Sequence, residues 1–194
     1  MIQALRLCNR QRARSIDLRL FRRIMATLLR DLIRPAQFDL TVHLVTASEI
    51  TRLNESYLRH RGPTDVITFN YTEEESRAAV ISPGVPGSAQ QFFRDAAGAR
   101  ISGGDVEERG PLVHGEIFIC LEEALAQSRR YRTTWPAELV RYFIHGTLHL
   151  CGYDDLEPSL RKRMKREEDR LLRDLSRQYS LRQLARPRRL RNSR

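Results

Sequence analysis

Apolar residues recur along the chain with two different periods, and these periods predict its elements. Between Ser15 and Leu32 an apolar residue returns every four positions, which is the spacing of one face of a helix. From Asp39 to Val45 apolar and polar residues alternate, as in a strand with one buried face. Ser48 is expected to cap the helix that follows this strand. By the same criteria the sequence predicts strands at 2–8, 65–71 and 116–120, and helices at 48–57, 121–131, 136–151 and 157–178.

Helices and strands are mixed without strict alternation, which predicts a layered α/β (α+β) domain. We expect a small mixed sheet of about four strands packed with about five helices. The chain has 194 residues, enough for one domain with a substantial core, which we place at 1–178. Residues 72–112 contain six of the ten glycines and are expected to form a flexible insertion. Residues 179–194 carry six arginines and are expected to form a disordered basic tail.

The net charge of +10 is concentrated at the two ends of the chain. Residues 161–194 have 14 Lys and Arg against 4 Asp and Glu, whereas residues 35–160 have a net negative charge. Basic ends are typical of proteins that bind a polyanion, although a solvated helix face with a solubilising tail would look the same. No apolar run reaches the roughly 18–20 residues of a membrane span. Without a convincing secretory segment, we expect a cytoplasmic protein whose three cysteines are reduced and lie in the core.

The strongest chemical pattern is HGTLHLCGYDD at residues 145–155. His145 and His149 are four residues apart in an apolar helical stretch, so their rings can point to one place. Gly152 is suited to end the helix, and the chain can then return Asp154 or Asp155 toward the histidines. Two imidazoles and a carboxylate leave one position of a tetrahedral zinc ion open, as in hydrolytic sites. The alternative is that the two histidines only form hydrogen bonds with their neighbours.

Gly146 separates this pattern from that of the zinc proteases. In HExxH proteases the residue after the first histidine is a glutamate that acts as general base. A glycine at this position removes the group that would activate water against a peptide. Hydrolysis of a peptide or an amide is therefore the least favoured interpretation of the site.

Three motifs together resemble the YbeY family of bacterial endoribonucleases: HGTLHLCGYDD, PTDVITF at Pro63–Phe69 and GEIFI at Gly115–Ile119. The resemblance covers most of residues 1–175. It implies a small α/β metalloprotein with a zincin-like metal helix and one zinc ion. It also implies an activity in ribosomal RNA maturation and ribosome quality control.

The chain departs from the family pattern at two chemically important positions. The family motif has three histidines, and the third falls on Asp155, so the predicted metal ligands are His145, His149 and Asp155. An ionised carboxylate lowers the net positive charge of the metal site and should weaken the electrostatic attraction between the metal ion and a phosphate group. Asp154 is expected to shape the turn or orient a histidine, and it is the substitute if Asp155 is not the ligand.

The second departure concerns a family arginine that is thought to be catalytic and falls on Leu58. Arg59 and Arg61 follow in the sequence, and Arg59 is the candidate catalytic residue, because a guanidinium can bind two phosphate oxygens. Otherwise both are solvated loop charges. His114 could face the site but is better interpreted as an ordinary strand-end histidine.

Two functions fit these expectations. The first is a zinc-dependent, single-strand-specific endoribonuclease, a hydrolase that acts on RNA phosphodiester bonds, with ribosomal RNA and the ribosome or its proteins as partners and no membrane. Its arginines would hold the phosphate and its basic ends would dock structured RNA. The second is a ribosome assembly factor that does not cut RNA and whose zinc is structural; Asp155 and Leu58 favour this alternative.

Overall fold

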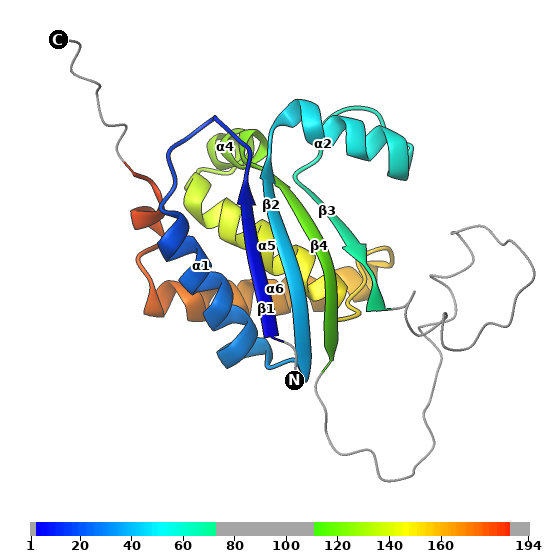
Figure 1. Cartoon of the computed structure of the whole chain (residues 1–194), viewed down its shortest axis with the longest axis vertical. Helices are drawn as coiled ribbons and strands as arrows, with labels where there is room; N and C mark the ends of the chain where they lie inside the picture. The colour runs from blue at the N-terminus through cyan, green and yellow to red at the C-terminus, as the bar shows by residue number, and fades with distance from the viewer. Residues whose placement is uncertain (1–2, 73–110, 187–194) are drawn as a thin grey trace, which may run out of the picture.

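The computed structural model describes residues 3–72 and 111–186, and its centre is a mixed sheet with the strand order β1-β2-β4-β3 (Figure 1). β1, β2 and β4 are parallel, whereas the short β3 is antiparallel to β4 and forms one edge of the sheet. This confirms the expected α+β class and the number of strands. The strands are β1 (Gln3–Asn9), β2 (Gln37–Val45), β3 (Val66–Asn70) and β4 (Leu112–Cys120).

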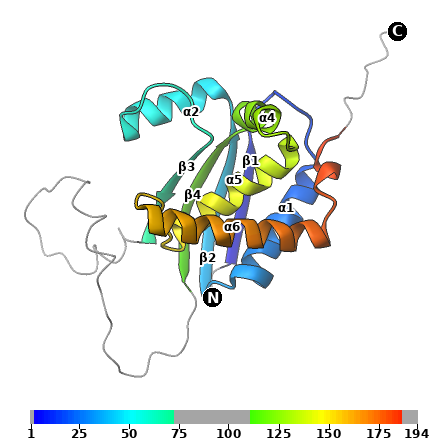
Figure 2. The same ribbon diagram turned by 180° about the vertical axis from the view of Figure 1, so that it is seen from behind.

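Most helices cover one face of the sheet, as the view from behind shows (Figure 2). They pack on a single apolar core in which α5 lies under β4 and β3, and α6 lies across α5. These helices are α1 (Leu18–Thr27) with its π-helical extension η1 (Leu28–Ile33), α4 (Leu121–Arg130), α5 (Trp135–Leu150) and α6 (Pro158–Gln178).

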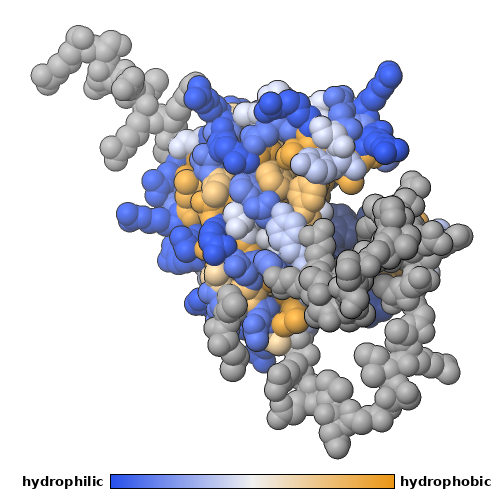
Figure 3. All heavy atoms as spheres, turned by 45° about the vertical axis from the view of Figure 1, so that its right-hand side comes forward, coloured by the Kyte–Doolittle hydropathy of each residue, from blue (hydrophilic) through white to orange (hydrophobic). Residues whose placement is uncertain are grey.

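Among the described residues, those that cover the opposite face of the sheet lie at one end of it, in α2 (Ala47–Leu53) and the π-helical turn η2 (Asn54–Leu58). There a smaller apolar cluster contains Ile50 of α2 and Phe118 of β4. Beyond this cluster, apolar side chains reach the surface between hydrophilic ones on the side shown in Figure 3. Tyr57 and Leu58 of η2 are 66% and 50% exposed.

Side chains at the helix starts explain where the predicted boundaries were wrong. α1 begins at Leu18 and not near Ser15, because the Asp17 carboxylate accepts a hydrogen bond from the Leu20 amide. α2 is capped by Thr46, whose hydroxyl accepts from the amide of Glu49, and Ser48 lies inside the helix. In α2 the predicted cap thus moves by two residues, to a neighbouring side chain of the same capping type.

The ordered chain continues past the boundary expected at residue 178. Leu181 and Leu184 form a short 3₁₀ turn, η4 (Leu181–Leu184), and both are buried in the main core. The Arg186 guanidinium then forms an ion pair with Asp17, at 2.7 Å. The expected tail at 179–194 is therefore wrong for 179–186, because two leucines anchor this segment among its arginines.

The remaining predictions about chain segments have separate outcomes. Nearly all of the expected insertion at 72–112 and the last eight residues of the tail lie outside the described residues. Within the described ranges, no helix is long and apolar enough to cross a bilayer. Of the three cysteines, all unpaired, only Cys120 is fully buried, and Cys8 and Cys151 are half-buried.

Candidate metal centre

Helix α5 carries both histidines, and its local sequence fixes how it is placed. Thr134 caps the helix through its hydroxyl, which accepts from the Ala137 amide, and Pro136 occupies the first turn. The apolar stripe predicted for this helix is buried against the sheet, with Phe143 and Ile144 inaccessible to solvent. His145 and His149 lie on the flank of that stripe and are half-buried, as the helical spacing predicted.

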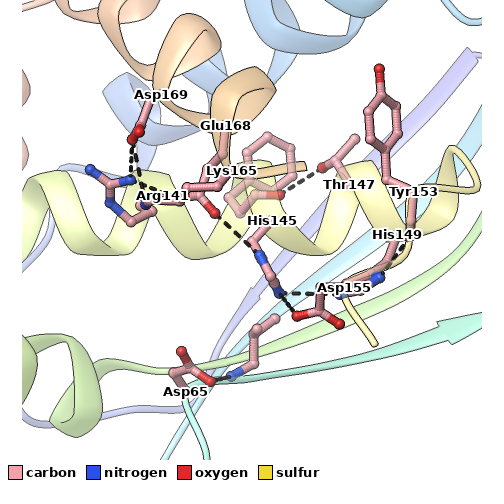
Figure 4. Close-up of polar contacts among 12 residues, drawn as sticks. Asp65, Arg141, His145, Thr147, His149, Tyr153, Asp155, Lys165, Glu168 and Asp169 are labelled. Atoms are coloured by element: carbon pink, nitrogen blue, oxygen red, sulfur yellow. Dashed lines mark hydrogen bonds and ion pairs between the residues drawn. The ribbon is translucent and has the colours of Figure 1, made fainter. Parts of the chain in front are cut away.

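The chain reverses direction directly after α5 and brings an aspartate back to the histidines. Gly152 has a φ of 84°, a left-handed conformation that glycine adopts at low cost. The Tyr153 carbonyl then accepts a hydrogen bond from Nδ1 of His149, at 3.0 Å. This places Asp155 beside the two rings (Figure 4).

The three predicted ligands converge closely enough to hold one metal ion. Their ligand atoms all lie within 4.8 Å of one another. The two Nε2 atoms of His145 and His149 are 3.1 Å apart, and Oδ2 of Asp155 is 3.9 Å from Nε2 of His145. Ligands at about 2.0–2.1 Å from a tetrahedral zinc ion are separated by about 3.3 Å. The observed separations lie on either side of this value, so the residues fit such an ion.

The hydrogen bonds behind the rings strengthen this conclusion. Nδ1 of His145 faces the Glu168 carboxylate at 3.2 Å, and Nδ1 of His149 faces a carbonyl, so each Nδ1 is the donor. In neutral imidazoles this leaves the Nε2 lone pairs of both rings facing each other. Burial, followed by the neighbouring His145, lowers the pKa of His149 and favours its neutral form. Two lone pairs at this distance repel each other unless a proton or a metal ion lies between them, and a metal ion would bind both at once.

Glu168 is the residue at this site that sequence reasoning missed. It comes from α6, is almost fully buried, and accepts hydrogen bonds from Arg141 and Lys165 as well as from His145. Burial raises its pKa, but the hydrogen bonds from His145, Lys165 and Arg141 outweigh burial and lower the pKa to about 2. Glu168 is therefore ionised and orients His145. One clue was present in the sequence, because this position belongs to the apolar stripe of α6 between Met164 and Leu171.

The neighbouring aspartate has a different role. Oδ1 of Asp154 accepts hydrogen bonds from the amides of Asp155 and Leu156, at 2.6 and 3.0 Å. Asp154 therefore shapes the turn, which is one of the two roles expected for it. The histidines are oriented instead by Glu168 and by the Tyr153 carbonyl.

Gly146 has a packing role that explains why no protease base occupies this position. A Cβ atom there would lie 2.9 Å from Cγ2 of Ile117 and 3.1 Å from Oγ1 of Thr68. α5 thus approaches the sheet too closely for a glutamate at residue 146. The prediction that this site lacks the general base of a peptidase has a steric explanation.

A groove of about 530 Å³ opens beside His145 between α4, α5 and α6. Of the three predicted ligands, His145 lines this groove, so the groove reaches one side of the candidate metal centre. Figure 4 shows Asp65, the residue before β3, on the same side of α5 as the ring of His145. The groove is lined by Asp65, Gln127, Tyr131, Thr133, Glu138, Arg141, Tyr142, His145, Lys165 and Glu168.

Arg59 stays a prediction as a catalytic residue. It is exposed and ends η2 in a left-handed conformation, with a φ of 56°. Among residues 3–72 and 111–186, no hydrogen bond or ion pair joins its side chain to another residue. Leu58, at the family's arginine position, is half exposed, so an arginine would fit there. His114 lies in β4 with its ring 5.6 Å from that of Tyr71, in line with an ordinary strand histidine.

Comparison with known proteins decides the family. The sequence pattern of the family described as Endoribonuclease YbeY matches residues 6–176. The chain belongs to the YbeY family. Among its relatives is the protein named Endoribonuclease YbeY from Chlorobium luteolum, 36% identical over 65% of this chain and 66% of that protein. The one from Salinibacter ruber is 32% identical over 69% of this chain and 68% of its own length. The matched region thus spans about two thirds of these YbeY relatives.

A solved structure supports the fold. The solution structure of TM1509 from Thermotoga maritima matches with a TM-score of 0.53 over 91% of each chain. Only 21% of the aligned residues are identical, so this likeness concerns the fold alone. It agrees with the mixed four-stranded sheet and the helices on its main face.

Proposed function

We propose that this YbeY-family protein is a zinc-dependent, single-strand-specific endoribonuclease in ribosomal RNA maturation and ribosome quality control. One observation carries the proposal: in a chain of an endoribonuclease family, two Nε2 lone pairs and one carboxylate converge at the side of an open groove. Metal identity is inferred from the ligand types, since two imidazoles and a carboxylate suit zinc. A zinc ion held there would act as a Lewis acid on water and on a phosphoryl oxygen.

The chain's own residues prepare the site for this reaction. Glu168 and the Tyr153 carbonyl fix both rings with Nε2 toward the shared position. The Asp155 carboxylate completes the set but brings a negative charge that a third histidine would not. Arg59 is the candidate for holding the phosphate, through two parallel hydrogen bonds from its guanidinium.

The partners follow from charge and family. Ribosomal RNA, with the ribosome or its proteins, fits the basic N- and C-terminal regions of a chain whose net charge is +10. We place this activity in the cytoplasm, where unpaired cysteines such as Cys8, Cys120 and Cys151 stay reduced.

The alternative is a ribosome assembly factor that binds RNA without cutting it and uses its zinc only for structure. Two departures from the family pattern favour it: Asp155 replaces the third histidine, and Leu58 replaces the arginine. Cleavage by the purified protein separates the two functions.

The test compares single-stranded RNA cleavage by the wild type, His145→Ala and a matched control, His114→Ala. We expect cleavage that requires metal, is lost in His145→Ala and persists in His114→Ala, because only His145 contributes to the ligand cluster. Equal residual cleavage in both variants would point to a contaminating nuclease. A wild type that binds metal and RNA but never cuts would favour the assembly factor.

A further inference from the structure

A second hollow, separate from the metal centre, lies on the outer face of α6. Its volume is about 480 Å³, and arginines dominate its walls. The outer face of α6 is opposite the buried stripe of Met164, Leu171 and Leu175, so these arginines are directed to solvent. The lining residues are Tyr153, Arg163, Arg166, Glu167, Asp169, Arg170 and Arg173.

Some of these arginines are neutralised within the helix and others are not. Arg170 pairs with Glu167 and Asp174 at 2.5 and 3.1 Å. For Arg166 and Arg173, no hydrogen bond or ion pair of the side chain is found within residues 3–72 and 111–186. The two are seven residues apart, so they share one helix face with Cα atoms about 10 Å from each other. Two exposed, unpaired guanidinium groups at one hollow favour an anionic ligand.

Tyr153 connects this hollow to the metal centre. Its ring lies under the guanidinium of Arg163, whose Cζ is 5.4 Å from the ring centre, whereas its carbonyl binds His149. Figure 4 shows the ring pointing away from the two histidines. The hollow is therefore on the other side of the Tyr153–Asp155 turn from the ligands. A long strand could occupy both places, but a very short one could not.

We infer that this hollow is an RNA docking site that binds phosphodiester groups outside the metal centre while another part of the same strand reaches the ligands. The inference rests on the proposed function for the nature of its ligand. A guanidinium binds phosphate oxygens in pairs, and an aromatic ring beside it suits a nucleobase. Arg166 and Arg173 differ in this respect from Arg170 and Arg177, which pair with Asp174 along the helix.

The experiment compares Arg166→Gln/Arg173→Gln with the control Arg52→Gln/Arg129→Gln in the full-length, metal-loaded protein. The control removes the same charge from exposed positions of α2 and α4, outside the two basic ends of the chain. Binding of a long labelled single-stranded RNA is measured over a range of salt concentrations. Each phosphate contact contributes about 0.7 to the slope of log K against log salt, so the α6 variant should lose about 1.4 and the control almost nothing.

Cleavage kinetics give the second measurement. For the long RNA the α6 variant should raise KM and leave kcat unchanged, because docking binds substrate and transition state equally. For a trinucleotide neither value should change. An unchanged salt slope, an equal change in the control, or an equal loss with the trinucleotide would each overturn the inference. If no variant cleaves RNA but the slope falls only in the α6 variant, the docking site stands and the nuclease proposal fails.

Discussion

One buried carboxylate, Glu168, couples the histidine pair to the cations of α6 and α5. It lies between Nδ1 of His145 and the side chains of Arg141 and Lys165. Such a residue behind a metal ligand fixes the ring orientation and raises the basicity of the ligating nitrogen. The approach of the two histidines and of an aspartate could be predicted from the sequence, because of the i, i+4 spacing and the glycine turn, whereas the choice of Asp155 over Asp154 came from the resemblance to the family motif. Glu168 could not be predicted, because it depends on how α6 crosses α5.

Replacing this carboxylate should weaken metal binding without touching a ligand. We expect Glu168→Ala to lower zinc affinity about 10–100-fold, the usual effect of losing the partner of a metal-bound histidine. Competition with a chromophoric chelator measures it. The matched control is Glu167→Ala, which removes the neighbouring carboxylate that pairs with Arg170 at the surface. Equal affinity in the two variants would contradict this role for Glu168.

At the scale of elements, the closeness of β3, β4 and α5 gives the site its rigid base. A Cβ atom on Gly115 of β4 would lie 2.1 Å from the Phe69 carbonyl oxygen and 2.9 Å from Cδ2 of Leu150. The periodicities predicted the strands themselves, since alternating apolar and polar residues indicate a strand with one buried face. They could not predict the strand order or the antiparallel β3, which depend on contacts between segments distant in the sequence. The errors in the starts of α1 and α2 had a local cause, because Asp17 and Thr46 are capping residues close to the predicted starts.

Alanine substitutions at Gly115 in β4 and at Gly62 in a loop should differ in their effect on stability. Gly115→Ala should destabilise the fold by more than the roughly 1–3 kcal/mol of ordinary overpacking, because the clash is with backbone. Gly62 has a φ of 87°, and nothing lies within 4 Å of its Cβ position. Gly62→Ala should therefore lower the free energy of unfolding by only about 1 kcal/mol, the cost of a left-handed backbone at alanine. Chemical denaturation measures both. A Gly115→Ala variant as stable as Gly62→Ala would argue against such close packing of β3.

At the scale of the whole molecule, the basic C-terminal region is partly packed into the fold. Arginine content alone suggested that everything after residue 178 was a tail. The structure divides this region instead into an anchored part, held by Leu181, Leu184 and the Arg186–Asp17 ion pair, and residues beyond 186. Composition misled here because two leucines among many arginines are inconspicuous in a sequence but sufficient to fix a short turn in a core.

Two truncations separate stability from RNA affinity. Ending the chain after Arg186 removes four arginines and keeps the buried Leu181 and Leu184, so thermal stability should persist while RNA affinity falls and depends less steeply on salt. Ending it after Tyr179 also removes two buried leucines, each contributing about 1.5–3 kcal/mol, and should lower the melting temperature markedly. An unchanged salt slope after the shorter truncation would mean that residues 187–194 do not contact RNA. Equal melting temperatures would contradict the anchored turn.

The central claim is that His145, His149 and Asp155 together bind one divalent ion, and elemental analysis of purified protein tests it most directly. The measurement compares the wild type with Asp155→Ala and, as the matched control, Asp154→Asn, whose amide oxygen can still accept the two hydrogen bonds of the turn, under conditions in which all three are folded. We predict close to one zinc ion per chain in the wild type and in Asp154→Asn, and a large loss in Asp155→Ala. Equal metal content in all three proteins, or no bound metal in the wild type, would contradict the account.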